Sequence, residues 1–345
     1  VPPLPVNSFA TSPAGDGAVR LSWKATVDSL ETTAKPTAYV VYTREGDGGF
    51  DNGRIVTDNS LIINQKPDVI YSYRVTAINA GGESFPSEIL TVCQLSDAKA
   101  TAMIVNGFDR VAAPECRKDG FHNEFDSGVA YLRDVAFIGE QRVHDTSKRR
   151  EKSEPRAFGV SFSNHQGEIV GGNSFDYPAL HGKSVVEAGF SFCSASVKSV
   201  EQGGVKLEKY PITDFIFGKQ RSCQIGRGAC DVDFEVFSEE LQDKIRAYTE
   251  QGGAVFASGS YVASDLWNGI ASDGEDKGFA RGVLHYSFSG DMATRRGQVR
   301  TVASPMNMPR LDITFNREPS ATHYGVESPG IIMPAGRDAF IAMRY

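Results

Sequence analysis

The first 94 residues alternate apolar and polar positions in short runs that are separated by turn residues. Such runs are Ala18–Trp23, Ala38–Tyr42 and Tyr71–Asn79, and the third run ends in a turn sequence that contains Gly81-Gly82. Alternation with a period of two indicates strands that are buried on one face. Several such strands with turn clusters between them are typical of a β-sandwich. We therefore predict an all-β domain over residues 1–94.

Beyond residue 94 the apolar runs become continuous and alternate with helical segments. Ala102–Gly107 is an apolar run that ends in Asn-Gly, as expected for the first buried strand of a parallel sheet. Helices are predicted at 183–188 and at 239–250, where Ser238 is a suitable N-cap and Gly252 a suitable C-terminal glycine. Strands alternating with helices predict a parallel α/β sheet covered on both faces, over residues 95–345. Its further strands are expected at 158–162, 168–170, 191–193, 214–217, 254–257 and 340–343.

The run Ala254–Ala257 leads into a tight turn of small residues, Ser258-Gly259-Ser260. Such a turn delivers a side chain to the carboxyl end of a strand, where open α/β sheets collect ligands and catalytic residues. A nucleophile also needs a base and a group that orients the base. A Ser260-His323-Glu327 triad satisfies this requirement, with backbone N–H groups after the turn as an oxyanion hole. The alternative is a turn of the same shape in a binding domain without catalysis.

Polar residues also follow other expected strand ends. Asp109, Asp176 and Asp265 are candidates to line one cleft, as cation ligands or as an acid and base. Their alternative role is to cap helices and turns. Asn106 and Asn173 adjoin glycines that would let the backbone approach a ligand closely, unless those glycines only form tight turns.

Aromatic residues near the same edge suggest a sugar-binding surface. Tyr177, Tyr261 and Trp267 would offer ring faces on which sugar rings stack, and their alternative is burial in the core. Among the histidines, His181 is the best candidate to line the cleft, because it lies just beyond an expected strand end. We expect these aromatic residues and His181 to complete the ligand-binding set.

Composition narrows the class of protein. The chain of 345 residues has a net charge of −7, is 40% hydrophobic and 23% charged, and intersperses both signs of charge. Its one basic run, at 148–152, is interrupted by an acid and indicates a solvated loop, so no nucleic-acid partner is expected. No apolar run approaches the ~18 residues of a membrane span.

The cysteines and histidines give no metal-binding pattern. No Cys-x-x-Cys or His-Glu-x-x-His spacing occurs, so neither a metal nor a cofactor is expected. Cys223 and Cys230 are candidates for a local disulfide in an oxidising compartment, with free thiols as the alternative.

The N-terminal segment resembles a fibronectin type III domain. The resemblance rests on Leu21-Ser22-Trp23, on Tyr39-x-Val41-Tyr42, and on the long stretch from Tyr71 to Ser87. It implies that Trp23 is the core indole and that Tyr71 is the tyrosine corner, whose hydroxyl bonds back to nearby backbone.

Several later blocks, taken together, resemble the C-terminal region of large secreted bacterial proteins that are labelled xanthan lyase or N-acetylmuramoyl-L-alanine amidase. These blocks are Ile104–Arg110, Phe137–Gln141, Gly171–Pro178, Ala257–Trp267 and Glu327–Ala335. The resemblance implies a fibronectin type III module followed by a flavodoxin-like α/β domain similar to class I glutamine amidotransferases. It also implies a secreted, periplasmic or cell-surface setting, with glycan or cell-wall material and other domains of a longer polypeptide as partners. The amidotransferase-like domain usually continues through another strand and helix, so we expect a truncation after Tyr345.

The amidotransferase pattern itself is not complete here. It places Cys on the turn after the central strand and a His-x-Glu pair later, whereas this chain has Ser260 and a His323-Tyr324-Gly325-Val326-Glu327 spacing. The expected function is therefore a non-catalytic accessory role in glycan or peptidoglycan processing. The alternatives are a serine hydrolase that acts through Ser260, and a purely structural spacer.

Overall fold

The computed structural model describes most of the chain and divides it into two compact units. The described residues are 1–15, 17–27, 31–107, 176–218, 220, 222, 235–291, 293–294, 297–315 and 329–345, with the backbone of short strands at 140–141, 161–162, 223–224 and 232–233. Unit 1 comprises Val1–Gly107, Phe175–Ile216 and Glu239–Ser258, and unit 2 comprises Phe108–Ser174, Phe217–Ser238 and Gly259–Tyr345. These units do not follow the domain boundary expected at residue 94, which stays a prediction.

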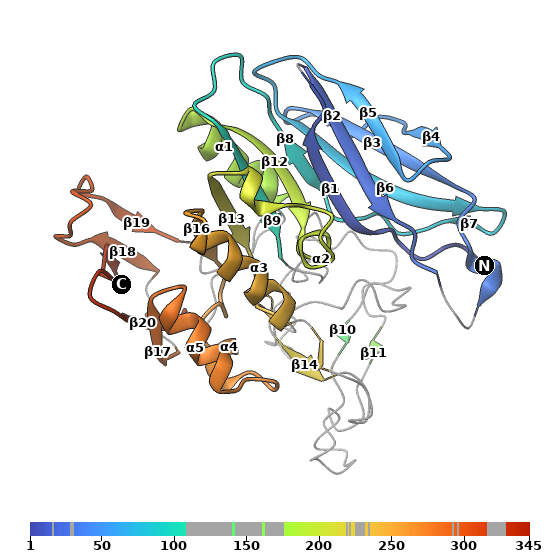
Figure 1. Ribbon diagram of the computed structural model, residues 1–345. Helices are drawn as coiled ribbons and strands as arrows, with labels where there is room; N and C mark the ends of the chain where they lie inside the picture. The colour runs from blue at the N-terminus through green and yellow to red at the C-terminus, as the bar shows by residue number, and fades with distance from the viewer. Residues whose placement is uncertain are drawn as a thin grey trace, which may run out of the picture. The chain divides into compact units, whose positions relative to one another are not determined.

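The N-terminal part of unit 1 is an antiparallel sandwich (Figure 1). One layer has the strand order β1-β2-β5, and the other has the order β4-β3-β6-β7, with β8 also paired to β6. This is the arrangement of a fibronectin type III-like module. The three strands expected from alternation are confirmed as β2, β3 and β6. The bounds are β1 Asn7–Pro13, β2 Ala18–Lys24, β3 Ala38–Glu45, β4 Arg54–Val56, β5 Ser60–Asn64, β6 Tyr71–Asn79, β7 Gly82–Glu83 and β8 Leu90–Val92, with a 3-10 turn at Thr32–Ala34.

Aromatic side chains fill the sandwich. The Trp23 side chain is buried and meets Phe9 and Tyr39 edge to face, at centroid distances of 6.4 and 5.4 Å. The Tyr71 hydroxyl donates to Glu45 at 3.2 Å and accepts from the Lys66 N–H at 3.5 Å. The second contact returns to nearby backbone, as the tyrosine-corner assignment requires.

The second part of unit 1 is a parallel sheet, with the strand order β12-β9-β13-β16. Its strands confirm the expected runs at 102–107, 191–193, 214–217 and 254–257. The outer edge of β12 also pairs antiparallel with β1 of the sandwich, with Ala195 opposite Ala10. The sandwich layer and the parallel strands thus form one seven-stranded mixed sheet. The bounds are β9 Thr101–Asn106, β12 Ser191–Ser196, β13 Ile212–Ile216 and β16 Ala254–Ser258.

Helix α1 (Tyr177–Glu187) lies against β9 and β12, and it begins earlier than the helix predicted at 183–188. The early start has a local cause, because Pro178 occupies the first turn, where its missing N–H costs nothing. A Cβ at Gly182 would lie 2.2 Å from Phe192 Cζ, so only glycine lets the helix approach the sheet this closely.

The two faces of the parallel sheet follow from alternation along its strands. Phe192 contacts α1, so Ile104 and Asn106 on β9 share the α1 face through their pairing with Ser194 and Ser196. Met103, Val105 and Phe215 point to the opposite face and are fully buried. Both faces of the sheet centre are therefore covered, as predicted. The remaining helices of unit 1 are α2 Val197–Glu201, capped by Ser196, and α3 Glu239–Glu250, with a 3-10 turn at Leu207–Lys209.

Unit 2 contains short helices and small sheets. Its aromatic centre is formed by Phe217, Phe237 and Phe279. The prediction that a strand at 340–343 closes the parallel sheet is wrong. Only the end of that region forms a strand, β21, and it pairs antiparallel with β18. The bounds are β10 Glu140–Gln141, β11 Ser161–Phe162, β14 Cys223–Gln224, β15 Val232–Asp233, α4 Asp265–Asn268, α5 Gly274–Gly282, β17 Tyr286–Gly290, β18 Gln298–Thr301, β19 Asp312–Thr314, β20 Ile331–Pro334 and β21 Met343–Arg344.

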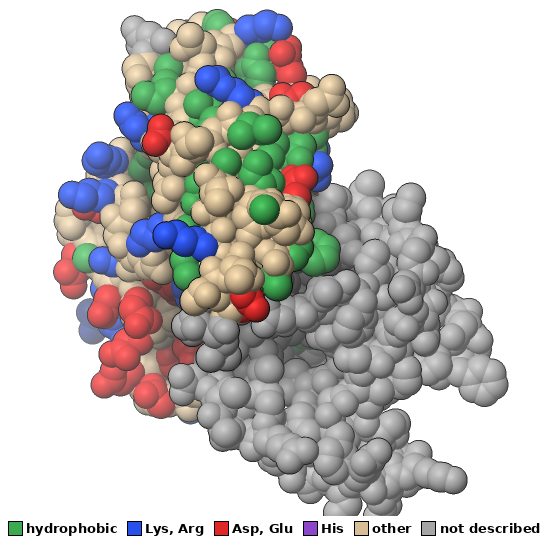
Figure 2. Space-filling model, turned by 90° about the vertical axis from the view of Figure 1, so that its right-hand side faces the viewer, with side chains coloured by type: hydrophobic (Ala, Val, Ile, Leu, Met, Phe, Trp, Pro, Cys, Tyr) green, Lys and Arg blue, Asp and Glu red, His purple; other side chains and the backbone are tan. Residues whose placement is uncertain are grey.

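The surface of the described residues is mixed in character. On the face seen in Figure 2, Lys and Arg side chains are scattered among acidic, apolar and neutral ones and form no continuous basic surface. None of the helices in the described ranges has both the length and the apolar character that a bilayer crossing needs.

Candidate functional site

The parallel strands of unit 1 end in polar residues. Asn106 of β9 lies beside Ser196 of β12 on one side and Ile216 of β13 on the other, and the Gly107 N–H donates to the Ile216 carbonyl at 2.8 Å. The chain leaves β9 for β12 on one side and then returns for β13 on the other. The β9–β13 boundary is therefore the topological switch point, outside which open α/β sheets bind ligands.

Asn106 is buried there, with 3% of its surface exposed. Its Oδ1 atom is sealed from solvent and has no hydrogen-bond partner among the described residues. A buried amide oxygen normally has a partner, and an unpaired one costs about 1–3 kcal/mol. The sequence prediction that Asn106 belongs to a ligand site is thus compatible with its position.

Asp214 lies in the middle of β13, on the same face of the sheet. It pairs in register with Ile104, two residues before Asn106, so the two side chains are diagonal neighbours beneath α1. Asp214 Oδ2 lies 2.7 Å from His181 Nδ1, whereas Asp214 Oδ1 is buried and has no partner in the described part of the chain.

His181 extends from α1 to this carboxylate. Its side chain is 26% exposed, against 10% for Asp214, so the imidazole lies between the buried acid and solvent. An ionised carboxylate only accepts, so Nδ1 must carry the proton in their hydrogen bond. In the neutral imidazole, Nε2 then remains as a lone-pair acceptor. We call Asn106, His181 and Asp214 the α1 polar cluster.

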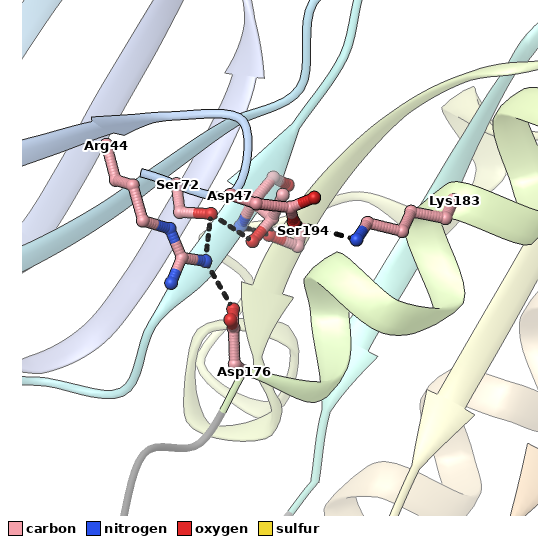
Figure 3. Close-up of polar contacts among 7 residues, drawn as sticks. Arg44, Asp47, Ser72, Asp176, Lys183 and Ser194 are labelled. Atoms are coloured by element: carbon pink, nitrogen blue, oxygen red, sulfur yellow. Dashed lines mark hydrogen bonds and ion pairs between the residues drawn. The ribbon is translucent and has the colours of Figure 1, made fainter. Parts of the chain in front are cut away.

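The start of α1 is attached to the sandwich by charged contacts (Figure 3). Arg44 donates from one terminal guanidinium nitrogen to Asp176 at 2.6 Å and to Ser72 at 2.8 Å, and Lys183 pairs with Asp47 at 2.7 Å. Asp176 therefore anchors α1, and Tyr177 follows it as the half-buried first residue of the helix.

Buried hydroxyl groups also link β12 to strands β1 and β8 of the sandwich. The Ser194 hydroxyl accepts from the Thr91 N–H and donates to the Thr91 carbonyl, both at 2.7 Å. The Thr11 hydroxyl bonds both backbone groups of Ser194, at 2.8 and 2.9 Å. These contacts hold β12 against the sandwich without help from solvent-exposed groups.

Unit 2 contains the remaining described candidates. Asp265 is buried and accepts from the Ser222 N–H, the Ser222 hydroxyl and the Val236 N–H, at 3.0, 2.5 and 3.1 Å. These three donors occupy its carboxylate, which supports the turn-bonding alternative. Tyr261 is half-buried.

Trp267 packs within its own unit. Its ring is stacked with Tyr286 at a centroid distance of 6.2 Å, lies 6.1 Å from Phe288 and has the Arg281 guanidinium 5.5 Å from its centroid. Burial raises the pKa of Tyr286, whose hydroxyl donates to the Val262 carbonyl at 2.5 Å. The indole is thus one member of a packed cluster, which favours the core alternative over a free stacking platform.

Ser260 follows β16 as expected, but its backbone is not that of a strained nucleophile. Its φ is not among the positive values of the described non-glycine residues, and its N–H donates to the Gly218 carbonyl at 2.8 Å. A Cβ at Gly259 would lie 2.9 Å from Phe217 Cβ, so the turn needs glycine for close packing. A nucleophile elbow is instead a sharp, strained turn.

Several predictions fall outside the described residues. Asp109 and Asn173, the partners His323 and Glu327, and the side chains of Cys223 and Cys230 are among them. Within the described ranges, no three His, Cys, Asp or Glu side chains are grouped so that they could hold a metal ion. Asn106 and His181 lie on facing elements of unit 1, and Asp176 and Tyr177 begin the helix that carries His181.

Sequence reasoning missed Asp214. It was read only as part of the strand 214–217, although a carboxylate inside a fully buried parallel strand needs a partner. That conflict between residue type and position was the available signal. Its partner, His181, is too distant in the chain for any local pattern to identify.

Comparisons with known proteins reach only part of the chain. No family model matches it, and no curated protein matches it. Among solved structures it is similar to the twitchin kinase region from C. elegans, at 25% identity over 29% of this chain and 18% of that chain, with a TM-score of 0.24. It is also similar to the FN5 domain of Drosophila Lar, at 20% identity over 28% of this chain and 99% of that domain, with a TM-score of 0.22.

A third similar structure is titin kinase with its flanking domains, at 20% identity over 30% of this chain and 22% of that one, with a TM-score of 0.25. The chain thus spans about a fifth of the length of the two kinase structures. Matches with such low TM-scores carry no argument about function. The assignment of a fibronectin type III-like module rests on the strand order of the sandwich.

Proposed function

We propose that this chain is a non-catalytic accessory module of a larger secreted protein that processes polysaccharide or peptidoglycan. In this proposal the fibronectin type III-like sandwich carries a flavodoxin-like, glutamine-amidotransferase-like sheet that binds glycan or cell-wall material. The parallel order β12-β9-β13-β16 supports it, since it reads 2-1-3-4 when these strands are numbered along the chain, as in the first strands of flavodoxin-like sheets.

The α1 polar cluster is the observation that carries the proposal. Acceptor atoms that have no partner in the described part of the chain lie beside the switch point, where open α/β sheets bind ligands. A protein under selection for stability alone gains nothing from two unpaired buried oxygens. His181 is the exposed member of the cluster, and in the neutral imidazole its Nε2 lone pair can accept a hydrogen bond from a hydroxyl-rich ligand.

Glycan binding tests this proposal directly. The whole chain, Asp214→Asn and the control Asp47→Asn, which changes an exposed acid on the sandwich, are applied to an array of bacterial and plant polysaccharides. We expect the wild type and Asp47→Asn to retain one class of glycan and Asp214→Asn to lose it. Retention of no glycan by the folded wild-type chain would contradict the proposal.

A structural spacer is the second candidate, and the continuous seven-stranded sheet favours it. A spacer holds its neighbouring domains at a fixed distance only if it is rigid. Pairing of β1 with β12 removes a flexible joint between the sandwich and the parallel sheet. Unit 1 cannot be produced alone for small-angle scattering, because it consists of three separate segments of the chain. Scattering of the whole chain with and without added glycan is therefore the test, and a spacer predicts identical profiles and no glycan binding.

The serine hydrolase alternative can be tested on the same preparation. A fluorophosphonate probe labels serines that a base activates, and Ser260→Ala serves as the control. Because the φ of Ser260 is not positive and the accessory function needs no activated serine, we expect no labelling of either protein. Labelling that disappears in Ser260→Ala would replace the accessory function with a hydrolytic one.

A further inference from the structure

We propose that the free edge of β5 pairs antiparallel with the same strand of a second copy of this chain. Strand β5 ends the seven-stranded sheet and lies at the rim of the sandwich (Figure 1). It pairs with β2 on one side, and no strand in the described part of the chain pairs with its other side. The proposal does not depend on glycan binding, because β2, β1 and β12 separate β5 from the strands of the α1 polar cluster.

Hydrogen bonds at the two ends of β5 determine which of its backbone groups face outward. The Trp23 N–H donates to the Asn59 carbonyl at 3.0 Å, and the Gln65 N–H donates to the Gly17 carbonyl at 2.6 Å. Both pairs continue the register that joins β2 to β5. Because hydrogen-bonded and non-hydrogen-bonded pairs alternate along an antiparallel ladder, the odd-numbered residues of β5 bond to β2.

The even-numbered residues Ser60, Ile62 and Asn64 therefore direct their N–H and C=O groups away from β2. None of the hydrogen bonds between described residues uses these backbone groups. A row of such groups is a template for strand pairing, and native sheets usually protect it with a charge, a proline, a bulge or a very short strand. Strand β5 has none of these protections, since its sequence is Ser-Leu-Ile-Ile-Asn and its register with β2 is continuous.

The side chains of β5 suit a pairing through its edge. Leu61 and Ile63 face the core, because their register partners on β2, Leu21 and Val19, are fully buried. Ile62 faces the other way and is 48% exposed. The strand is thus held in the sandwich by two residues and presents one aliphatic side chain at its centre.

A two-fold axis at Ile62 uses every outward backbone group. Antiparallel pairing about this axis places Ile62 opposite Ile62 of the second copy, and Ser60 opposite Asn64 at both ends. Each of these residue pairs exchanges two hydrogen bonds. A shift of the pairing by two residues in either direction leaves one outward residue of each copy without a partner. The self-complementary register is therefore the one with the most hydrogen bonds.

Charge complementarity also selects a second copy as the occupant. In this register Asp58 of one copy lies opposite Lys66 of the other at both ends of the strand pair, and both residues are exposed. Lys66 pairs with Glu45 of its own chain at 3.1 Å but keeps 70% of its side chain exposed, so it remains accessible to a second carboxylate. Arg20, the register partner of Ile62 on β2, lies three strand spacings or about 14 Å from its counterpart, where salt screens the repulsion.

Sedimentation velocity of the whole chain tests the proposal. We expect a reversible equilibrium between monomer and dimer with a Kd of about 1 μM to 1 mM, since an edge-to-edge strand pair buries less area than a standard interface. A wild-type chain that stays monomeric up to about 1 mM overturns the proposal and leaves the edge to solvent or to a strand of another protein.

Two matched variants locate the interface. Ile62→Lys places two ammonium groups opposite each other and is expected to raise the Kd at least about tenfold. Ile55→Lys changes an isoleucine that is 68% exposed on β4, an edge strand of the other layer, and is expected to leave the Kd unchanged. A dimer that Ile62→Lys retains, or that both variants weaken equally, contradicts pairing through β5.

A cross-link tests the register itself. The Cα atoms of a hydrogen-bonded antiparallel pair are about 5.5 Å apart, which a disulfide can span. Ile62→Cys, treated with oxidised glutathione, should therefore give a covalent dimer whose linked peptide joins the two substituted positions. Ile55→Cys and the wild type, with its five natural cysteines, are the controls and should give no such dimer. Absence of the Ile62→Cys link overturns the pairing. No glycan is present in these measurements, so they succeed or fail independently of the glycan array.

Discussion

The two sheets that meet in unit 1 use different means to define their structure. The sandwich is formed by antiparallel pairs, of which half join strands that follow one another in the chain, such as β1 with β2. Its core indole packs between Phe9 and Tyr39. The parallel sheet joins strands as distant as β9 and β16, and β12 separates β9 from the sandwich. The sandwich thus combines local hairpins with longer-range pairs, whereas all pairs of the parallel sheet join strands that do not follow one another in the chain.

This difference bears on where function lies. Parallel pairing brings Asn106 and Asp214 to one face, where an oxygen of each has no partner among the described residues. The sandwich stabilises the edge of the sheet that carries the site.

The largest expected effect tests whether the two sheets unfold together. Phe215 is fully buried in β13, so Phe215→Ala should lower the free energy of unfolding by about 3–5 kcal/mol. In a Trp267→Phe background, the fluorescence of Trp23 reports on the sandwich alone. We expect urea unfolding followed by Trp23 to shift to lower urea in Phe215→Ala, because β1 and β12 share one sheet.

The matched control is Phe256→Ala, which changes an exposed phenylalanine on β16 of the same sheet and should have a much smaller effect. An unchanged Trp23 transition in Phe215→Ala would mean that the sandwich unfolds independently.

Glycine substitutions in two helices should act in opposite directions. Gly182→Ala places a Cβ 2.2 Å from Phe192 Cζ, and such overpacking should destabilise unit 1 by about 1–3 kcal/mol. Gly278→Ala in α5 meets no atom within 4 Å and should stabilise unit 2 by up to about 1 kcal/mol through helix propensity. Thermal unfolding measures both effects.

The double variant Gly182→Ala with Phe192→Leu refines this test. It should be less destabilised than the sum of its single variants, because a smaller side chain at 192 leaves room for the methyl group. Additive effects would show that contact with the Phe192 ring is not the cause of the destabilisation.

Removal of one hydroxyl should weaken the junction between the sheets. Ser194→Ala leaves the Thr91 N–H without its acceptor, which should cost about 1–3 kcal/mol in the free energy of unfolding. Hydrogen exchange at the Thr91 amide should accelerate in parallel. Ser12→Ala, at a half-buried position on β1, is the control, and equal effects of both substitutions would argue against the special role of Ser194.

The smallest effect concerns the exposed ion pair between Asp47 and Lys183. A hydrogen bond and the charge of Lys183 lower the pKa of the Asp47 carboxyl. Because the folded-state pKa is the lower one, the contribution to stability is present above the unfolded-state pKa and is lost as the pH falls through the folded-state value. Lys183→Met should raise the pKa of Asp47 in an NMR titration, and an unchanged value would show that the pair does not persist in solution.

Sequence reasoning located most of unit 1's strands and fewer of its site residues. Alternation revealed β2, β3 and β6, and continuous apolar runs revealed β9, β12, β13 and β16, because these patterns depend on neighbouring residues. Helix α1 begins six residues before the predicted helix at 183–188, because Pro178 is accommodated in its first turn. The strand expected at 340–343 failed because hydrophobicity alone does not select its partner.

What the sequence determined by itself was the identity of the elements with a clear apolar pattern, such as β6, β9 and α3, and the presence of Asn106 at the end of one strand. Only the tertiary structure decided that β12 pairs with both β9 and β1, and that His181 meets Asp214. The physical reason is that local patterns reflect which face of an element is buried, whereas strand order and register depend on contacts between residues far apart in the chain.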